Sequence, residues 1–256
     1  MRKTNKKLKL CFLILSIAVY LAFLLARLGS ADPTGASVTN LSTETYSVSP
    51  ESGQDAGGTI TTILLDATQQ ESAWKAYVGN ITGTLVLRNS DGWSIYEWAM
   101  NSSTLSGNVF VSRNDSVNWT SGAIRCANSS IIDSEQTFLG MTTSNTYSIN
   151  KTFNYTIHKT MTISGVGSIQ NSTCPSTATY VNGSAQTISE SAYFQEILLT
   201  DTNNLIYATF IDQDAWGYNN NESVNGTNVT YDFQLIVAEN RSASVGTVYY
   251  FYADIA

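Results

Sequence analysis

The stretch "AYFQEILLTDTNNLIYATFI", residues 192–211, holds two apolar runs on either side of a short polar turn. Both runs are rich in aromatic and β-branched residues, as strands are, and the Asn203-Asn204 pair between them favours a tight hairpin. A second turn of this kind, Asp91-Gly92 in "RNSDGWS", also lies between two apolar runs. The sequence therefore predicts a fold built from antiparallel hairpins.

The strand pattern covers most of the chain beyond residue 58. Eleven candidate strands are TITTILL (59–65), WKAYV (74–78), GTLVLR (83–88), WSIYEWAM (93–100), NVFVS (108–112), TFNYTIH (152–158), MTIS (161–164), AYFQEILL (192–199), LIYATFI (205–211), YDFQLIV (231–237) and TVYYFYADI (247–255). One segment, SSIIDSEQTFLG (129–140), predicts a short helix with Ser129 or Ser130 as N-cap and Gly140 past its end. We predict an all-β fold, an antiparallel β-sandwich of Ig-like or jelly-roll-like type with one short helix.

The first 31 residues are typical of an export signal. Positions 1–9 hold five Lys or Arg residues and no acid, and positions 10–26 are apolar apart from Ser16. This run is longer than the apolar part of a usual signal peptide and slightly shorter than a spanning helix. Two alternatives stay open: a signal peptide cleaved near residues 29–31, or a hydrophobic signal-anchor helix that is retained. In both cases the following chain is expected outside the cell or at its surface.

Composition divides the remaining chain into two parts. Residues 32–58 are polar and rich in Ser, Thr and Gly, which is typical of a linker or stalk. Residues 59–256 carry the strand pattern and have the length of one all-β domain, without a repeat of fixed period. We therefore expect a leader (1–31), a stalk (32–58) and a β-sandwich ectodomain (59–256).

Acceptors for N-glycosylation are far more frequent than chance predicts. Fourteen of the twenty-two asparagines are followed two places on by Ser or Thr, whereas random placement would give about five. They are Asn40, Asn80, Asn101, Asn114, Asn118, Asn128, Asn150, Asn154, Asn171, Asn182, Asn221, Asn225, Asn228 and Asn240. We expect a chain that passes through a glycosylating export route and carries glycans at most of these sites.

Strand alternation in "NKTFNYTIH", residues 150–158, agrees with that expectation. In a strand, the apolar side chains of Phe153, Tyr155 and Ile157 would share one face. The acceptors Asn150 and Asn154 would then lie on the opposite, polar face, where glycans need water.

Cysteine usage fits an oxidising compartment. Cys11 lies in the apolar leader, so Cys126 and Cys174 are the two cysteines of the exported part. Two exported thiols usually form one disulfide, and closing a loop of this length would stabilise the fold by roughly 3–4 kcal/mol. A thiolate metal site is disfavoured, because there is no CxxC spacing and no histidine cluster.

The charge distribution excludes nucleic acid as a partner. The chain has a net charge of −7, and beyond residue 31 only seven Lys or Arg residues stand against twenty Asp or Glu residues. Nucleic-acid recognition requires a basic surface, and anionic lipid attracts polybasic clusters. A membrane is therefore expected as a partner only through the N-terminal segment, if that segment is retained.

No motif of a known catalytic class occurs in the sequence. The single histidine, His158, ends an alternating run and is interpreted as a surface residue at a strand end rather than as a catalytic base. The acids Glu97, Glu190, Glu196 and Asp201 are conceivable members of a carboxylate pair for glycoside cleavage, but nothing in their spacing brings two together. We predict a protein that is not an enzyme.

Calcium is the one cofactor for which the sequence offers a candidate. "DQDAWGYNNNE", residues 212–222, supplies hard oxygen ligands from Asp212, Asp214 and Asn219 to Glu222. The stretch departs from an EF-hand loop, because Gly217 directly follows Trp216 where an Asp or Asn ligand would stand. An acidic turn without metal is the favoured interpretation, so no cofactor is expected apart from covalent glycans.

Several landmarks, in this order, resemble uncharacterised archaeal secreted cell-surface glycoproteins. They are WKAYVGNITGTLVL (74–87), DGWSIYEWAM (91–100), IRCANSS (124–130), STCPSTATYVN (172–182), YDFQLIV (231–237) and YYFYADI (249–255). The resemblance spans most of residues 74–254. It implies a β-type surface glycoprotein without established activity, a Cys126–Cys174 pair, and Asn80 in a loop after Trp74 and Tyr77.

Two function classes remain. The first is a structural subunit of the cell envelope or of an extracellular filament, which the leader, the stalk and the dense acceptors favour. The second is an adhesion or carbohydrate-binding module, in which Trp93, Trp98 and Trp216 would form a sugar platform. Core packing is the more common role of tryptophan and is the competing interpretation.

The strand predicted at 247–255 bears on assembly. Its residues Val248 to Tyr252 are all apolar or aromatic, so both faces of the strand need cover. The cover is either internal or supplied by a neighbouring copy, whose segment 59–65 follows a Gly57-Gly58 hinge and would add as a strand. The second alternative predicts self-association into a polymer.

Overall fold

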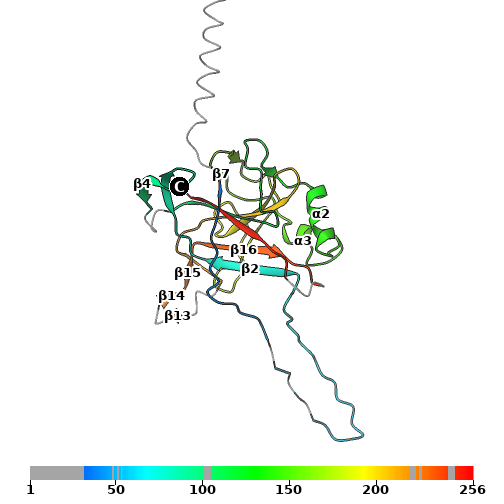
Figure 1. Ribbon diagram of the computed structural model, residues 1–256. Coiled ribbons are helices and arrows are strands. Elements are labelled where there is room, and N and C mark those ends of the chain that lie inside the picture. The colour runs from blue at the N-terminus through cyan, green and yellow to red at the C-terminus, as the bar shows by residue number, and fades with distance from the viewer. Residues whose placement is uncertain are drawn as a thin grey trace, which may run out of the picture.

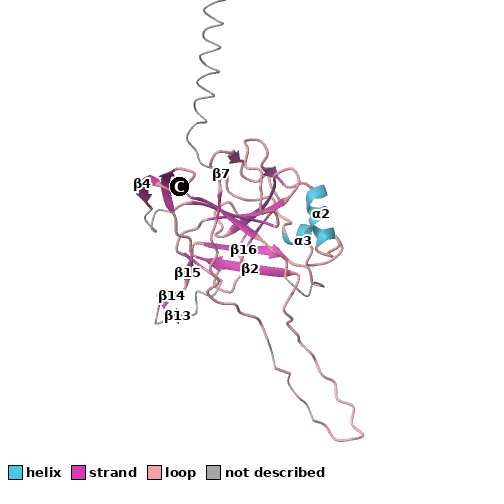
Figure 2. Ribbon diagram, viewed as in Figure 1, coloured by secondary structure: helices cyan, strands magenta, loops and turns pink. Residues whose placement is uncertain are grey.

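The computed structural model describes residues 32–47, 49–50, 52, 54–100, 105–218, 223–224, 227–241 and 246–255. These residues form an all-β structure of antiparallel strands with two short helices and long loops (Figures 1 and 2). No helix within these ranges has the length and apolarity to cross a membrane. The predicted leader, residues 1–31, lies outside them.

A seven-stranded antiparallel sheet forms the centre of the fold, in the order β1-β17-β5-β11-β10-β6 with β9 also paired to β10. Its strands are β1 (Thr34–Gly35), β5 (Gly107–Ser112), β6 (Arg125–Cys126), β9 (Ser176–Ala178), β10 (Gln195–Thr200), β11 (Leu205–Phe210) and β17 (Tyr250–Ile255). β10 and β11 form the hairpin predicted around Asn203-Asn204, and every residue of both strands is buried.

Five two-stranded sheets and two helices complete the described structure. The paired strands are β16 (Phe233–Ala238) with β2 (Trp74–Gly79), β3 (Thr84–Arg88) with β4 (Ser94–Ala99), β7 (Met161–Ile163) with β8 (Gly167–Ile169), β12 (Ala215–Trp216) with β15 (Thr230–Tyr231), and β13 (Ser223–Val224) with β14 (Thr227–Asn228). The helices are α2 (Ser129–Phe138) and α3 (Ile149–Thr152). β16 and β2 lie side by side across the body, with the two helices at its flank (Figure 1).

The central sheet buries both of its faces, because successive side chains alternate between two hydrophobic cores. In β11, Leu205 and Tyr207 point into a first core with Leu235 of β16. The helices α2 and α3 contribute Ile132 and Ile149 to the same core. The first core therefore lies between the sheet and a layer made of β16, β2 and the helices.

The second core covers the opposite face of the sheet. Ile206 and Phe210 of β11 pack there with Met161 of β7 and with Trp119, which lies in a loop. The Trp119 ring contacts Phe110 of β5 at a centroid distance of 5.0 Å. A strand with buried side chains on both faces shows a continuous apolar run, which explains the sequence pattern of β10 and β11.

β17 is partly covered within its own chain. Phe251 packs against the first core and Tyr252 belongs to the second. One edge of β17 pairs with β5, and the other pairs with β1 through Thr34↔Ala253 and Gly35↔Tyr252. Its own chain thus covers Phe251 and Tyr252, whereas Val248 and Tyr250 remain 63% and 41% exposed. Two residues of the predicted stalk belong to the central sheet.

Two segments project from the body. Residues 37–72, called the arm here, lie between β1 and β2; their described residues form no strand or helix, and the middle of the segment extends away from the body as a long loop (Figure 1). The strand predicted at 59–65 does not form, because no other described segment lies beside it to provide backbone hydrogen bonds. The second projection is the β3–β4 hairpin, whose turn contains the predicted Asp91-Gly92 pair, with Gly92 at a φ of +88°.

The strand predicted at 152–158 is also wrong. Its first residue ends helix α3, where Ser148 O accepts hydrogen bonds from Lys151 N and Thr152 N. Asn150 consequently lies on a helix, and the two-face alternation proposed for this stretch does not occur. Phe153 is buried, whereas Tyr155 and Ile157 are 46% and 40% exposed.

The predicted helix at 129–140 is present as α2, with a different cap. Asn128 is the N-cap, and its side-chain oxygen accepts a hydrogen bond from Ile131 N at 3.0 Å. Gly140 follows the helix with a φ of +67°, as its sequence position predicts. Asparagine caps helices as well as serine does, so Asn128 takes the role expected for Ser129 or Ser130.

Candidate functional site

The acceptor asparagines lie at the surface wherever their side chains are described. Eight are exposed: Asn40, Asn80, Asn118, Asn128, Asn150, Asn154, Asn171 and Asn182. Two more, Asn114 and Asn240, are partly exposed. The side chains of Asn101, Asn221, Asn225 and Asn228 lie outside the described set. In contrast, Asn108, which is not an acceptor, is 3% exposed and donates to Thr162 O.

Two acceptors, Asn118 and Asn128, form their side-chain hydrogen bonds through the amide oxygen, whereas Asn114 and Asn171 also donate through the nitrogen to which a glycan attaches. Asn128 caps helix α2 through its Oδ1 atom, which a glycan on Nδ2 would not remove. Asn118 Oδ1 accepts from the hydroxyl of Thr120, the third residue of its triplet, at 2.7 Å. Asn114 Nδ2 donates to Ser116 O, and a glycosylated amide keeps one N–H for such a bond.

The cysteines Cys126 and Cys174 are at disulfide distance, with their sulfur atoms 1.93 Å apart. The bond joins β6 at the edge of the sheet to the loop before β9, next to the second core. It closes a loop with a sequence separation of 48.

His158 supports this same region and is not a surface residue. Its side chain is fully buried. Nε2 accepts from the backbone N–H groups of Thr173 at 3.0 Å and Cys174 at 2.9 Å. Nδ1 lies 2.8 Å from Lys159 O, to which it can donate. The interpretation as a strand-end surface residue is therefore wrong: the ring is buried because backbone groups satisfy both of its nitrogens.

The four carboxylates considered for catalysis each have separate partners. Glu97 is exposed and pairs with Arg88, and Glu190 accepts hydrogen bonds from Asn171 and Ser172. Glu196 is fully buried, and one of its oxygens accepts from Ile236 N. Burial alone would raise the pKa of Asp201, but hydrogen bonds from backbone and side-chain N–H groups hold it below its ordinary value.

The acidic turn at 212–222 binds its own chain through the residues that are described. Asp212 accepts from Lys159 Nζ at 2.6 Å and from Phe194 N at 2.6 Å. Asp232, which lies nearby, accepts from Ile81 N and Asp214 N. No group of three or more His, Cys, Asp or Glu residues that could hold a metal occurs in the described part of the chain. Asn219 to Glu222 lie outside that part.

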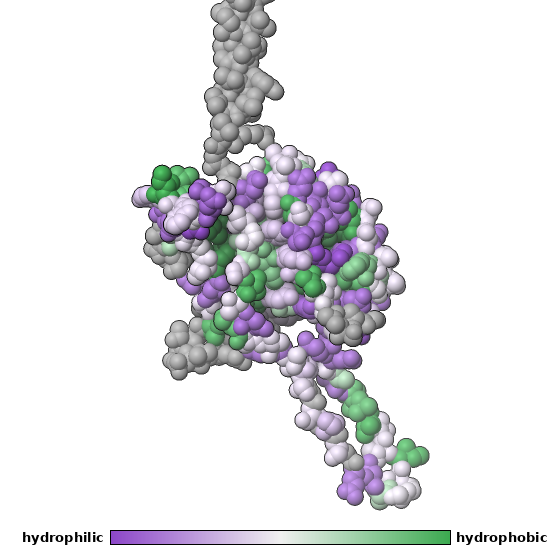
Figure 3. All heavy atoms as spheres, in the orientation of Figure 1, coloured by the Kyte–Doolittle hydropathy of each residue, from purple (hydrophilic) through white to green (hydrophobic). Residues whose placement is uncertain are grey.

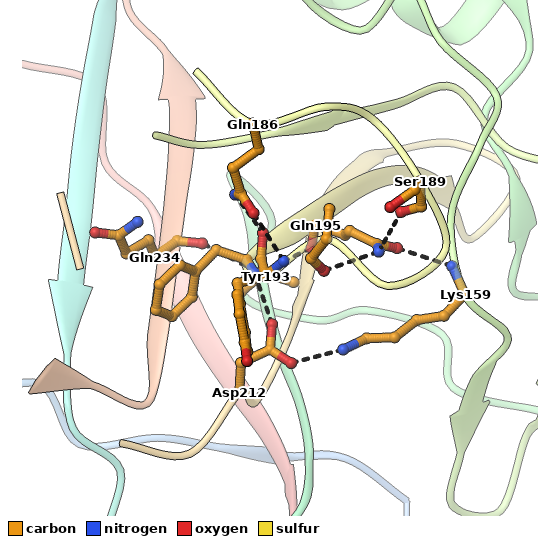
Figure 4. Close-up of polar contacts among 10 residues, drawn as sticks. Lys159, Gln186, Ser189, Tyr193, Gln195, Asp212 and Gln234 are labelled. Atoms are coloured by element: carbon orange, nitrogen blue, oxygen red, sulfur yellow. Dashed lines mark hydrogen bonds and ion pairs between the residues drawn. The ribbon is translucent and has the colours of Figure 1, made fainter. Parts of the chain in front are cut away.

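Side-chain amides extend this network and fix the loop before β10 (Figure 4). Gln195 Oε1 accepts from Lys159 N, and its Nε2 donates to Ser189 O. Gln186 binds both the N–H and the C=O of Tyr193. The side-chain amides of these glutamines thus form the backbone hydrogen bonds that a neighbouring strand would otherwise provide. This role could not be predicted from the sequence, because the residue type does not reveal which backbone groups a glutamine will meet.

A polar pocket of about 250 Å³ lies between α2 and the β10–β11 turn. Its charged lining residues, Arg113 and Glu135, bind each other through two hydrogen bonds of 2.7 Å. The Arg113 guanidinium also lies over the Phe138 ring, 3.6 Å from its centroid. This arrangement fastens the helix to the end of β5.

Aromatic side chains are most exposed on the β3–β4 hairpin, where Trp93 and Trp98 are 77% and 49% exposed. Tyr96 and Trp98 lie with ring centroids 4.9 Å apart. The side chain of Trp216, the third residue of the predicted platform, is not among those described. In Figure 3 the hairpin shows hydrophobic and hydrophilic residues side by side.

Comparison with known proteins identifies no relative. The chain matches no protein-family model, and neither a curated protein nor a solved structure is significantly similar to it.

Proposed function

We propose that this chain is a non-enzymatic, N-glycosylated structural protein of the cell surface, a subunit of the envelope or of an extracellular filament. The observation that carries the proposal is the placement of the acceptors. Ten of the fourteen have described side chains, and none of the ten is buried. The exported chain has few charged residues, so glycans would supply much of its solubility.

The remaining parts of the proposal rest on the sequence. The leader directs export and is either cleaved or kept as an anchor, and the resemblance to archaeal surface glycoproteins supports the same compartment. The finer fold assignment, an Ig-like or jelly-roll-like sandwich, belongs to the proposal too. It is supported by the two buried faces of the central sheet and the β16–β2 layer beside it.

An adhesion or carbohydrate-binding module is the second candidate. The exposed rings of Trp93, Tyr96 and Trp98 favour it, because sugars stack on aromatic faces. Ligand sites for small polar molecules also need a few polar groups directed at the ligand. Binding to immobilised glycans by the monomeric protein would support this candidate.

Native protein isolated from its own host tests the structural proposal. Peptide mass spectrometry should find glycans at most of the described acceptors, and sedimentation with electron microscopy should find the protein in a regular polymer or layer. Fewer than about four occupied sites would contradict a glycan coat, given that about five acceptors arise by chance. A protein that stays monomeric at native concentration would contradict the structural role.

A further inference from the structure

The arm and the β3–β4 hairpin each expose several large apolar side chains, although on the hairpin Tyr96 and Trp98 contact each other. On the arm these are Ile60, Ile63, Leu64 and Leu65, which are 101%, 68%, 93% and 82% exposed. Exposed apolar clusters of this kind mark sites of protein association.

Four of the exposed apolar residues of the hairpin share one face, whereas Val86 lies on the other. Leu85 pairs with Trp98 and Leu87 pairs with Tyr96 across the two strands, so these four side chains lie on the same side. The opposite side carries the Arg88–Glu97 ion pair. Neither strand pairs with a third strand among the described residues. An isolated two-stranded hairpin is marginally stable in water, so added cover would stabilise it.

Predicted glycan acceptors are sparse on these two projections: the arm holds one, Asn40, near its start, and the hairpin holds none. Residues 41–100 hold one acceptor, Asn80, whereas residues 101–240 hold twelve. Neither the apolar segment 59–65 nor the hairpin contains any. A surface that must join another protein has to remain free of glycans.

Geometry and charge indicate which partner fits. In Figure 1 the arm points away from the hairpin of its own chain, and in Figure 3 apolar residues mark both projections. Residues 32–72 contain acids and no Lys or Arg, and on the hairpin Arg88 is already paired with Glu97. The four-residue apolar face and segment 59–65 are themselves uncharged, so two acidic copies can meet there without repulsion.

We propose that residues 59–65 of one copy bind the apolar face of the β3–β4 hairpin of the next copy. This inference rests on the proposed structural function and specifies which two surfaces join neighbouring copies. Because the donor and the receiver are different surfaces, the contact is heterologous and extends head to tail. An extended segment can add along the free edge of β3 and place its leucines beside Leu85 and Leu87.

The same face is a poor sugar platform. Its members are two leucines and two aromatic residues, and the polar groups of the hairpin, Arg88, Ser94 and Glu97, bind one another. The polar groups left to the face are the Tyr96 hydroxyl and the Trp98 indole N–H, with no charged or amide group beside them, fewer than a site that binds several sugar hydroxyls usually has.

Charged substitutions in the full-length glycosylated protein test the contact. Leu64→Lys in the arm and Leu87→Lys in the hairpin face should each reduce the pelleted polymer at least tenfold. The matched controls Thr45→Lys, elsewhere in the arm, and Val86→Lys, on the opposite face of the hairpin, should polymerise as the wild type does. Circular dichroism and thermal melting should be the same for all variants, since both sites are exposed.

Mixing the two defective variants gives the decisive measurement. The Leu64→Lys protein keeps an intact hairpin and the Leu87→Lys protein keeps an intact arm, so an equimolar mixture should form dimers and no polymer. Wild-type polymerisation by either variant, or polymer in the mixture, would overturn the proposed contact. A Leu87→Lys protein that still polymerises but no longer binds immobilised glycans would also overturn it, because the hairpin face would then be a sugar-binding site. Failure of the wild type to assemble would refute the structural function itself.

Discussion

Glu196 is a carboxyl group at the centre of an all-β core. It lies on β10, is fully buried, and has one oxygen hydrogen-bonded to Ile236 N while the other has no partner. Burial raises the pKa of Glu196 well above its usual range, because the charged form loses its hydration. The folded protein therefore holds a proton that the unfolded chain releases near pH 4.3.

This shift has a defined sign for stability. Because the pKa is higher in the folded state, the unfolding free energy should fall as the pH rises above about 4.3, by up to ~1.4 kcal/mol per pH unit until Glu196 ionises or the fold opens. Glu196→Gln should remove that dependence and be more stable than the wild type at pH 7. Urea unfolding of both proteins at pH 4.5, 6 and 7.5 measures this pH dependence of the unfolding free energy. Parallel pH profiles would contradict the assignment.

The burial of single polar residues could not be predicted from the sequence. Glu196 and His158 both occupy apolar runs, and their types suggested a catalytic candidate and a surface residue. A polar side chain can be buried where backbone groups are positioned to form hydrogen bonds with it, as the N–H groups of Thr173 and Cys174 do with His158. Those groups come from distant parts of the chain.

At the scale of elements, Arg113 joins α2 to the end of β5. Glu135 is 6% exposed and receives both hydrogen bonds of the guanidinium, which also stacks on Phe138. Arg113→Met should leave a mostly buried carboxylate without its partner and destabilise the protein by about 2–4 kcal/mol. The double variant Arg113→Met/Glu135→Gln should recover part of that loss.

Denaturant unfolding of the three proteins measures the coupling. The Lys159–Asp212 pair, broken by Lys159→Met, provides a second ion pair for comparison. A loss below about 0.5 kcal/mol for Arg113→Met would mean that the pair behaves like an exposed one.

Hairpins were predictable because their turn residues are local. Asp91-Gly92 and Asn203-Asn204 each stand directly between the two strands that they connect. Nine of the eleven proposed strands are present. The two failures depended on distant partners. Segment 59–65 has a strand-like composition but no neighbour to pair with, and residues 152–158 begin in a helix that packs on α2. The exposure of the hairpin face could not be decided from its sequence either, because tryptophans are usually buried.

At the scale of the whole molecule, the Cys126–Cys174 bond restricts the unfolded chain. With a sequence separation of 48, the closed loop should contribute roughly 3–4 kcal/mol to the unfolding free energy. Reducing agent should lower the stability of the wild type by this amount and leave a Cys126→Ser/Cys174→Ser variant unchanged. Alkylation of the unreduced, denatured protein checks the bond itself. Labelling of both cysteine peptides would contradict it.

The order of strands in the central sheet also sets an order in time. β17 lies between β1 and β5, so β1 cannot take its place until β17 is present. Thr34 and Ala253 pair across about 220 positions, a separation at which contacts form slowly. During synthesis the segment around β1 therefore stays unpaired until the rest of the protein has been made. If the chain is glycosylated as proposed, a modifying enzyme has its longest access to unpaired chain at Asn40, six residues after Thr34, and far shorter access near the C-terminal strands.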